Sequence, residues 1–374
     1  MSTDSRLGHP EIDVEMRYIL GEGARAVRGE QLPPSECARQ QLETRARRRT
    51  WFCSSHLLVP IKEPINPLVR MDLAVLEQRY PNIVRAFSNR WISQQLGRPE
   101  KDRHALLVYM KNAIDDEPKI LNLKRRITTA TTDVEKANFG SVVEMLSIFS
   151  ETLTLLEYSL GELASDAGIQ TLVKELKSDY RKFLSSVSVA TLACYLRDRG
   201  RLVLFPKFNL GARKKVLDLA VNLVDRQVWI EVTTPAPANV LFVAEATSAS
   251  LPERAPGQLR DEFRDNFEPI IATGQLREEP IVIAIDGHWT EIDDIEVHIA
   301  LDGRQPQVVS EDIETDLFVN YPGTEKVSGV VIYKRAEIMD GRMQLAGVYI
   351  RNPRAVTPLS GEEVGLLTSS PMSS

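Results

Sequence analysis

Two short segments of this sequence each carry one carboxylate among apolar residues. Asp218 lies within residues 214–221, and Glu231 lies within residues 227–234. Both segments have the composition of strands, and an ionised carboxylate among apolar side chains is costly unless another group offsets its charge. If the two strands are antiparallel neighbours, both carboxylates meet at one edge of the sheet, where their oxygens suit Mg²⁺ or Mn²⁺. A cation held there would polarise a phosphodiester and activate a water molecule.

A structural role is the alternative for both carboxylates. Asp218 would then end a strand and pair with Lys214 or Lys215, and Glu231 would pair with Arg226 or another basic surface residue. Exposed ion pairs of this kind are common and contribute little to stability.

Other familiar catalytic and cofactor-binding patterns are missing from the sequence. It contains no GxxxxGK[ST] or GxGxxG phosphate-binding loop and no GxSxG nucleophile turn. None of its five histidines stands at metal-ligand spacing from another. The three cysteines, Cys37, Cys53 and Cys194, fit neither a disulfide framework nor a zinc site. The carboxylate pair is therefore the clearest chemical signal.

Strands around the carboxylates are predicted from apolar runs that turn residues separate. The expected strands are residues 201–208, 214–223, 227–233, 280–286, 328–334 and 345–351. A helix is expected at 257–272, before the fourth strand. Three consecutive strands with short links form a meander, and the helix makes a crossover to the fourth strand. These elements predict an α/β sandwich with a mixed sheet.

Helical periodicity dominates the chain before these strands. Apolar residues recur at three- and four-residue spacing in residues 71–79, 82–96, 101–113, 141–164 and 171–199. The last segment is expected as one long helix or two joined helices, closed by Gly200. The apolar stripe of 141–164 is typical of packing inside a small bundle, and a partner-binding or dimerising helix is the alternative.

Length and composition predict the domain organisation. The 374 residues are too many for one compact core of ordinary size. We expect an irregular, partly flexible N-terminal segment, an α-helical domain, an α/β domain and a disordered Ser-rich tail, at residues 1–68, 69–168, 169–358 and 359–374.

Charge and hydropathy limit the partners. The net charge is -6, and acidic residues outnumber basic ones by 16 to 10 between residues 201 and 300, which counts against tight nonspecific DNA binding. The sequence has no signal-peptide pattern and no uncharged apolar run of bilayer-spanning length. This pattern predicts a cytoplasmic protein without a membrane partner.

The element order and the two carboxylates resemble the PD-(D/E)xK superfamily of nucleases, which have the restriction endonuclease-like fold. In that superfamily a helix and a strand precede an Asp-bearing strand, and a strand with Glu-x-Lys, a helix and a further strand follow. The matching segments are residues 183–200, 201–208, 216–219, 228–233, 257–272 and 280–286. The segments 300–303, 327–331 and 352–355 are similar to the ends of uncharacterised bacterial members. The resemblance covers about the last 200 residues.

What the resemblance implies is a metal-dependent nuclease that acts on DNA phosphodiesters. Asp218 and Glu231 would be the ligands of Mg²⁺ or Mn²⁺. The family lysine, two residues after the glutamate, orients the nucleophilic water and stabilises charge on the phosphate. Thr233 stands at that position here and supplies no charge. The departure predicts impaired catalysis.

Three interpretations of the threonine at position 233, in place of the family lysine, stay open. A displaced cation from Lys214, Arg260 or Arg264 completes an active site near Thr233, or the site binds metal without cleaving. In the third, the fold is retained for binding alone, as an adaptor whose helical domain recruits a protein partner or forms a homodimer. The sequence is thus compatible with an impaired nuclease and with a non-catalytic adaptor.

Overall fold

The computed structural model describes residues 71–166, 168–178, 180–205, 217–234, 279–287, 318 and 323–368. The chain divides into two compact units, and all described residues belong to the larger one, Pro60–Gln305 with Val309–Ser374. The expected segment 1–68 and the expected helix 257–272 lie outside the described residues, and so do Lys214, Arg260 and Arg264.

Seven α-helices precede the sheet in the described part of the chain. They are α3 (Leu73–Arg79), α4 (Pro81–Phe87), α5 (Asn89–Leu96), α6 (Ala105–Thr129), α7 (Asp133–Glu162), α8 (Ile169–Leu176) and α9 (Tyr180–Asp198). Several of these helices begin at a residue whose side-chain oxygen caps the first turn. Asp72 accepts the N–H of Val75 at α3, and Thr132 accepts the N–H of Glu135 at α7. Such caps satisfy amides that have no partner within the helix.

The single helix expected at residues 82–96 is wrong, because Ser88 separates α4 from α5. Ser88 has a φ of +69°, which is uncommon for a residue with a side chain. Its hydroxyl accepts the N–H of Trp91, so it caps α5. In contrast, the helix expected at 101–113 continues much further, through Pro118 to Thr129.

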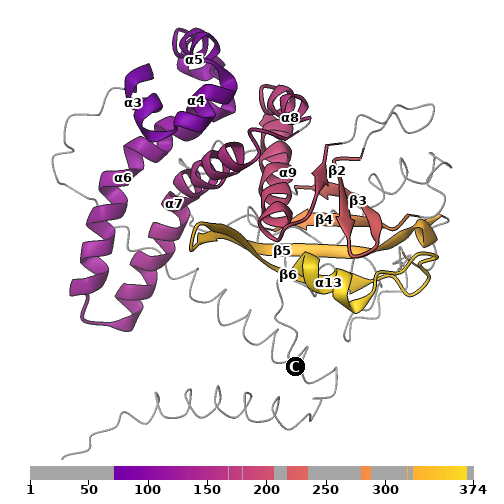
Figure 1. Ribbon diagram of the computed structural model, residues 1–374. Coiled ribbons are helices and arrows are strands. Elements are labelled where there is room, and N and C mark those ends of the chain that lie inside the picture. The colour runs from indigo at the N-terminus through magenta and orange to yellow at the C-terminus, as the bar shows by residue number, and fades with distance from the viewer. Residues whose placement is uncertain are drawn as a thin grey trace, which may run out of the picture. The chain divides into compact units, whose positions relative to one another are not determined.

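Helix α7 lies beside α6 and contributes a buried stripe of Phe149, Leu153, Leu156 and Leu160 (Figure 1). Its Glu157 accepts the N–H groups of Asn82 at 2.8 Å and Ile83 at 2.9 Å. A carboxylate in this place complements the positive end of the α4 dipole. No described helix is by itself long and apolar enough to cross a membrane. The two parts of α7, Asp133–Glu144 and Leu146–Glu162, bend by 45° and meet that criterion of length and composition only together.

The described strands form one six-stranded mixed sheet, ordered β1 to β6 along the chain. They are β1 (Val203–Leu204), β2 (Leu219–Leu223), β3 (Arg226–Thr233), β4 (Ile281–Asp286), β5 (Val327–Met339) and β6 (Arg342–Arg351). The first three form an antiparallel meander, β3, β4 and β5 are mutually parallel, and β6 returns antiparallel to β5 (Figure 1). The predicted α/β class with a mixed sheet after a helical region is confirmed.

Helix α9 covers one face of this sheet. Val228, Ile230 and Val232 of β3 belong to the same buried cluster as the apolar residues of α9. Alternate residues of a strand point to opposite faces, so Trp229 and Glu231 point away from α9. Both are also buried, at 6% and 5% exposure. Strand β3 is thus buried on both of its faces.

A single hydrophobic cluster joins the helices and the sheet. It contains buried residues from Leu76 in α3 to Leu367 near the end of the described chain. The hydroxyl of Tyr158 in α7 also lies 3.0 Å from Oδ2 of Asp198 in α9. The domain boundary expected at residue 168 stays a prediction.

The disordered tail expected after residue 358 is wrong for residues 361–368, which form α13 (Gly361–Thr368). The Ser360 hydroxyl accepts the N–H of Glu363 at 3.2 Å, and the Glu363 carboxylate accepts the N–H of Ser360 at 2.7 Å. This reciprocal pair is a capping box. Leu367 is fully buried in the common cluster, so local capping and tertiary packing both favour the helix.

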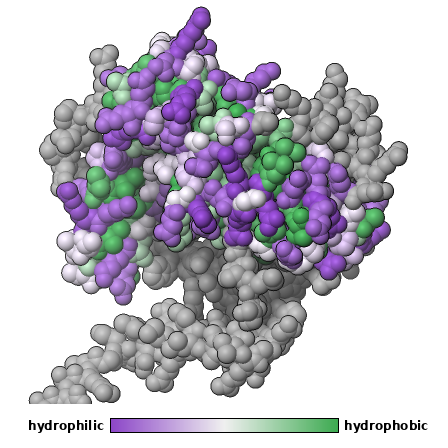
Figure 2. All heavy atoms as spheres, in the orientation of Figure 1, coloured by the Kyte–Doolittle hydropathy of each residue, from purple (hydrophilic) through white to green (hydrophobic). Residues whose placement is uncertain are grey.

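Polar residues cover most of the described surface that is visible in Figure 2, and apolar residues occupy separate areas. The exposed large apolar residues are Leu121, Val134, Leu202, Leu204, Val224, Met339 and Val356. They are spread over helices, strands and turns.

Candidate functional site

Asp218 lies one residue before β2 and completes its pairing with β3. Its Oδ2 accepts the backbone N–H of Val232 at 2.8 Å. The N–H of Trp229 points the other way and donates to Pro280 beside β4. Because amides alternate in direction along a strand, the amide of Val232 faces β2. The Asp218 carboxylate therefore takes the position of the next backbone acceptor in the β2–β3 ladder.

Asp218 and Glu231 adjoin the last pair of the β2–β3 ladder. That pair is Leu219 with Ile230, and the two acidic residues are the next ones along each segment. Directly opposed residues of an antiparallel ladder share a face, with Cβ atoms about 4.5–5.5 Å apart. Asp218 is half-buried, whereas Glu231 is 5% exposed. The two predicted ligands thus occupy neighbouring positions at one end of the hairpin.

Thr233 is the last residue of β3 and is half-buried. It stands two residues after Glu231 and points to the same face. It is paired with Ile285 of β4. A threonine hydroxyl donates one hydrogen bond and accepts others, but it carries no charge. Lys214, the predicted cation, lies outside the described residues.

Arg226 does not pair with Glu231, so this part of the structural alternative is wrong. The Arg226 guanidinium forms a bidentate ion pair with Glu363, with Nε–Oε1 and Nη2–Oε2 distances of 2.7 Å and 2.8 Å. Its Nη2 also donates to the carbonyl oxygen of Pro358 at 2.7 Å. These contacts direct Arg226 to the α9 face and to α13, away from the Asp218 end of the hairpin.

A second polar group, which the sequence analysis missed, lies on the α9 face at the ends of β3 and β4. Ser188 of α9, 3% exposed, donates to Oδ2 of Asp286 at 2.6 Å and accepts from the hydroxyl of Thr234 at 2.8 Å. Thr234 and Asp286 each come directly after the last parallel pair of β3 and β4, Thr233 with Ile285. The sequence did indicate that Thr234 and Asp286 lie close together, because polar residues at the ends of parallel strands meet at one edge of the sheet. Their partner on α9 depends on tertiary packing.

Tyr333 of β5 adjoins this group, since it is paired with Asp286. Burial raises the pKa of the Tyr333 hydroxyl well above its ordinary value, and the nearby Tyr195 and Asp286 add to that effect. Tyr333 therefore stays neutral across the physiological pH range.

The chemistry of the site is defined by oxygen donors. No group of three or more His, Cys, Asp or Glu side chains within the described ranges could hold a metal ion. The two carboxylates of Asp218 and Glu231 are ligands of the kind that Mg²⁺ takes, since this ion binds proteins through one or two carboxylates and keeps several waters. The donor set fits Mg²⁺ or Mn²⁺ and lacks the nitrogen and sulfur ligands typical of a zinc site.

No family model, no curated protein and no solved structure matches this chain.

Proposed function

We propose that this chain is a nuclease-like protein of restriction endonuclease-like fold that acts on DNA phosphodiesters with a divalent cation. The observation that carries the proposal is the β2–β3 hairpin, in which Asp218 and Glu231 adjoin the last pair of the ladder, Leu219 with Ile230. Two carboxylates at neighbouring positions, one half-buried and one buried, repel each other, and a shared cation offsets that repulsion.

Strand order and direction support the proposal. An antiparallel meander, a crossover and a strand parallel to β3 form the order that the superfamily resemblance implies. Asp218 lies one residue before the second strand and Glu231 lies on the third, close to where the family's acidic residues lie.

Asp218 and Glu231 would hold the cation, and when bound the cation polarises the phosphodiester and lowers the pKa of a bound water. Asp218 keeps its orientation through the N–H of Val232. Glu231 is fixed by β3, which pairs with strands on both sides. Thr233 would hydrogen-bond the attacking water without stabilising negative charge on the phosphate. We therefore expect cleavage to be slow unless Lys214 or another cation reaches the site.

Binding without cleavage is the second candidate, and two observations favour it. Oδ2 of Asp218 already accepts the amide of Val232, which gives this carboxylate a structural role. Thr233 also replaces the lysine that catalysis in the superfamily requires. In this case the chain acts as an adaptor that binds DNA or a protein partner through the same fold.

The test uses isosteric neutral variants of the full chain. Asp218→Asn keeps an oxygen that accepts the Val232 amide, and Glu231→Gln keeps the side-chain volume, so both remove charge with little change in shape. Asp225→Asn is the matched control, because Asp225 is an exposed acidic residue in the β2–β3 turn at the other end of the same hairpin. Mn²⁺ uptake is measured by calorimetry, and nicking of supercoiled plasmid is measured with Mg²⁺ or Mn²⁺.

The nuclease proposal expects Mn²⁺ uptake and slow nicking in the wild type and in Asp225→Asn, and the loss of both in Asp218→Asn and Glu231→Gln. Metal uptake without nicking would support the second candidate instead. The cation site itself is refuted if the wild type takes up no Mn²⁺, or if Asp218→Asn and Glu231→Gln bind it as the wild type does.

A further inference from the structure

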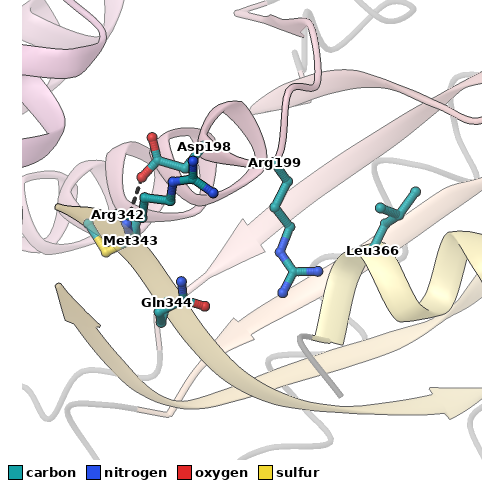
Figure 3. A pocket seen from close by; sticks show the side chains of 6 residues that line it. All are labelled: Asp198, Arg199, Arg342, Met343, Gln344 and Leu366. Carbon is teal, nitrogen blue, oxygen red and sulfur yellow. Dashed lines mark hydrogen bonds between the residues drawn. The ribbon is translucent and has the colours of Figure 1, made fainter. Parts of the chain in front are cut away.

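A pocket of about 390 Å³ lies where three distant parts of the sequence meet. Its lining residues are Asp198 and Arg199 at the end of α9, Arg342, Met343 and Gln344 at the beginning of β6, and Leu366 of α13 (Figure 3). This volume is within the range of sites for small organic molecules. Met343 belongs to the buried cluster on the α9 face, whereas Glu231 points to the opposite face. The pocket is therefore separate from the site of the proposed function.

Asp198 fixes one wall of the pocket. Its Oδ2 accepts the N–H of Met343 at 2.6 Å, shown as a dashed line in Figure 3. The hydroxyl of Tyr158 lies 3.0 Å from the same oxygen. These contacts hold the first residues of β6 against the end of α9. They also turn the Asp198 carboxylate towards the backbone of β6, while Arg199 extends towards α13 (Figure 3).

Arg199 lies in the opposite wall of the pocket, and two contacts hold its guanidinium group in place. Its guanidinium carbon lies 4.7 Å from the centre of the Tyr195 ring, and its Nη1 donates to the carbonyl oxygen of Gly365 at 3.5 Å. A guanidinium that is stacked on an aromatic ring and aligned by a helix carbonyl loses little entropy when it binds an anion. Tyr195 is itself held, because its hydroxyl donates to the carbonyl oxygen of Leu366 at 3.2 Å.

Arg342 supplies the second positive charge, from the exposed beginning of β6. The lining therefore carries one more positive than negative charge, although the whole chain carries a net charge of -6. Gln344 adds an amide that donates and accepts hydrogen bonds, and Leu366 adds a half-buried apolar contact. Guanidinium groups bind carboxylate and phosphate oxygens through paired hydrogen bonds.

We propose that this pocket binds a small organic oxyanion, a phosphate or carboxylate attached to a small apolar group. Arg199 and Arg342 hold the oxyanion, Gln344 bonds its remaining oxygen, and Leu366 contacts the apolar part. Since the lining joins α9, β6 and α13, the bound anion stabilises the packing of α13 on the sheet. This inference does not rest on the proposed function.

The test is calorimetric titration of the full chain with phenyl phosphate, benzoate, inorganic phosphate and, as the neutral analogue, benzyl alcohol. EDTA is present throughout, which removes any contribution of a divalent cation at Asp218 and Glu231. The variant is Arg342→Gln, at an exposed position where loss of folding is not expected. Arg351→Gln is the matched control, because Arg351 is an exposed arginine at the other end of β6.

We expect phenyl phosphate or benzoate to bind, inorganic phosphate to bind more weakly, and benzyl alcohol not to bind. Arg342→Gln should weaken binding by about tenfold or more, and Arg351→Gln should leave it unchanged. Arg199→Lys, which keeps the charge but loses the planar fork, should weaken it as well. No uptake of either organic anion by the wild type refutes the proposal, and so does equal affinity in Arg342→Gln and Arg351→Gln.

Discussion

Replacement of Glu363 by Gln tests how the C-terminal helix is held on the sheet. The Glu363 carboxylate is 4% exposed and accepts three hydrogen bonds, two from Arg226 and one from the N–H of Ser360. Glutamine has the same shape, but its NH₂ group would face one of these donors. The change therefore removes the charge, one or two hydrogen bonds and part of the capping box, without leaving a cavity.

The expected loss follows from the burial of the two partners. Removal of one partner from a fully buried ion pair costs about 3–5 kcal/mol. The Arg226 side chain is 37% exposed, so water solvates it once the carboxylate is gone, which reduces the cost. We expect Glu363→Gln to lower the free energy of unfolding by about 2 kcal/mol. Glu362→Gln, at an exposed position in the same helical turn, should change it by less than about 0.5 kcal/mol.

The loss should also depend on pH in a defined direction. Burial alone would raise the pKa of Glu363, but hydrogen bonds from Arg226 and Ser360 outweigh it and hold the pKa below its ordinary value. A carboxyl whose pKa is lower in the folded state stabilises fully above its unfolded pKa of about 4.3, and this stabilisation disappears as the pH falls through the folded pKa. The wild type and Glu363→Gln should therefore differ most near pH 7 and converge in acid.

Urea denaturation followed by far-UV circular dichroism at pH 7 and at lower pH measures both effects. The reasoning is refuted if Glu363→Gln is as stable as Glu362→Gln at pH 7, or if the difference from the wild type does not narrow in acid. A double-mutant cycle with Arg226→Gln adds a check. Because the two substitutions remove the same interaction, their effects on the free energy of unfolding should not be additive.

Two further substitutions test contacts of β5 and β6, each by urea denaturation. Asn352→Ala removes the side-chain amide that donates to the carbonyl oxygens of Thr324 and Val327, both at 2.8 Å. We expect the free energy of unfolding to fall by about 2–4 kcal/mol. A decrease below about 1 kcal/mol would contradict this role. Gly329→Ala would place a Cβ atom 2.5 Å from the carbonyl oxygen of Ile350, which is backbone, and should cost about 1–3 kcal/mol. Gly361→Ala, where a Cβ meets nothing within 4 Å, is its control and should be neutral or stabilising.

The strand pattern was predictable because short-range signals determine it. Apolar runs predict β2, β3 and β4 to within a few residues, although the residues before 217 lie outside the described part. The extension of β5 and β6 beyond the predicted strands also has a local signal. Asp340 and Gly341 form the two-residue turn between them, both with positive φ, and Asp-Gly is a favoured pair for such hairpin turns. Ser360 and Glu363, three residues apart, are a local capping-box signal for α13, although the Ser-rich composition led to the prediction of a disordered tail there.

The contacts of the candidate sites were less predictable, because their partners are far apart in the sequence. Ser188 meets Asp286 across 98 residues, and Arg226 meets Glu363 across 137 residues. Such pairs depend on how α9 and α13 pack on the sheet, which no local pattern specifies. The neighbouring positions of Asp218 and Glu231 are different, because a tight hairpin with a two-residue turn fixes the register of β2 and β3.

Strand geometry also excludes an ion pair between Arg226 and Glu231, which the sequence composition suggests. Arg226 and Glu231 are five residues apart on the same strand, and an odd separation directs their side chains to opposite faces. The rise along a strand further separates them by roughly 16 Å. Arg226 therefore cannot offset the charge of Glu231, whatever packs around the sheet. A group that does so must come from the face that Glu231 shares with Thr233.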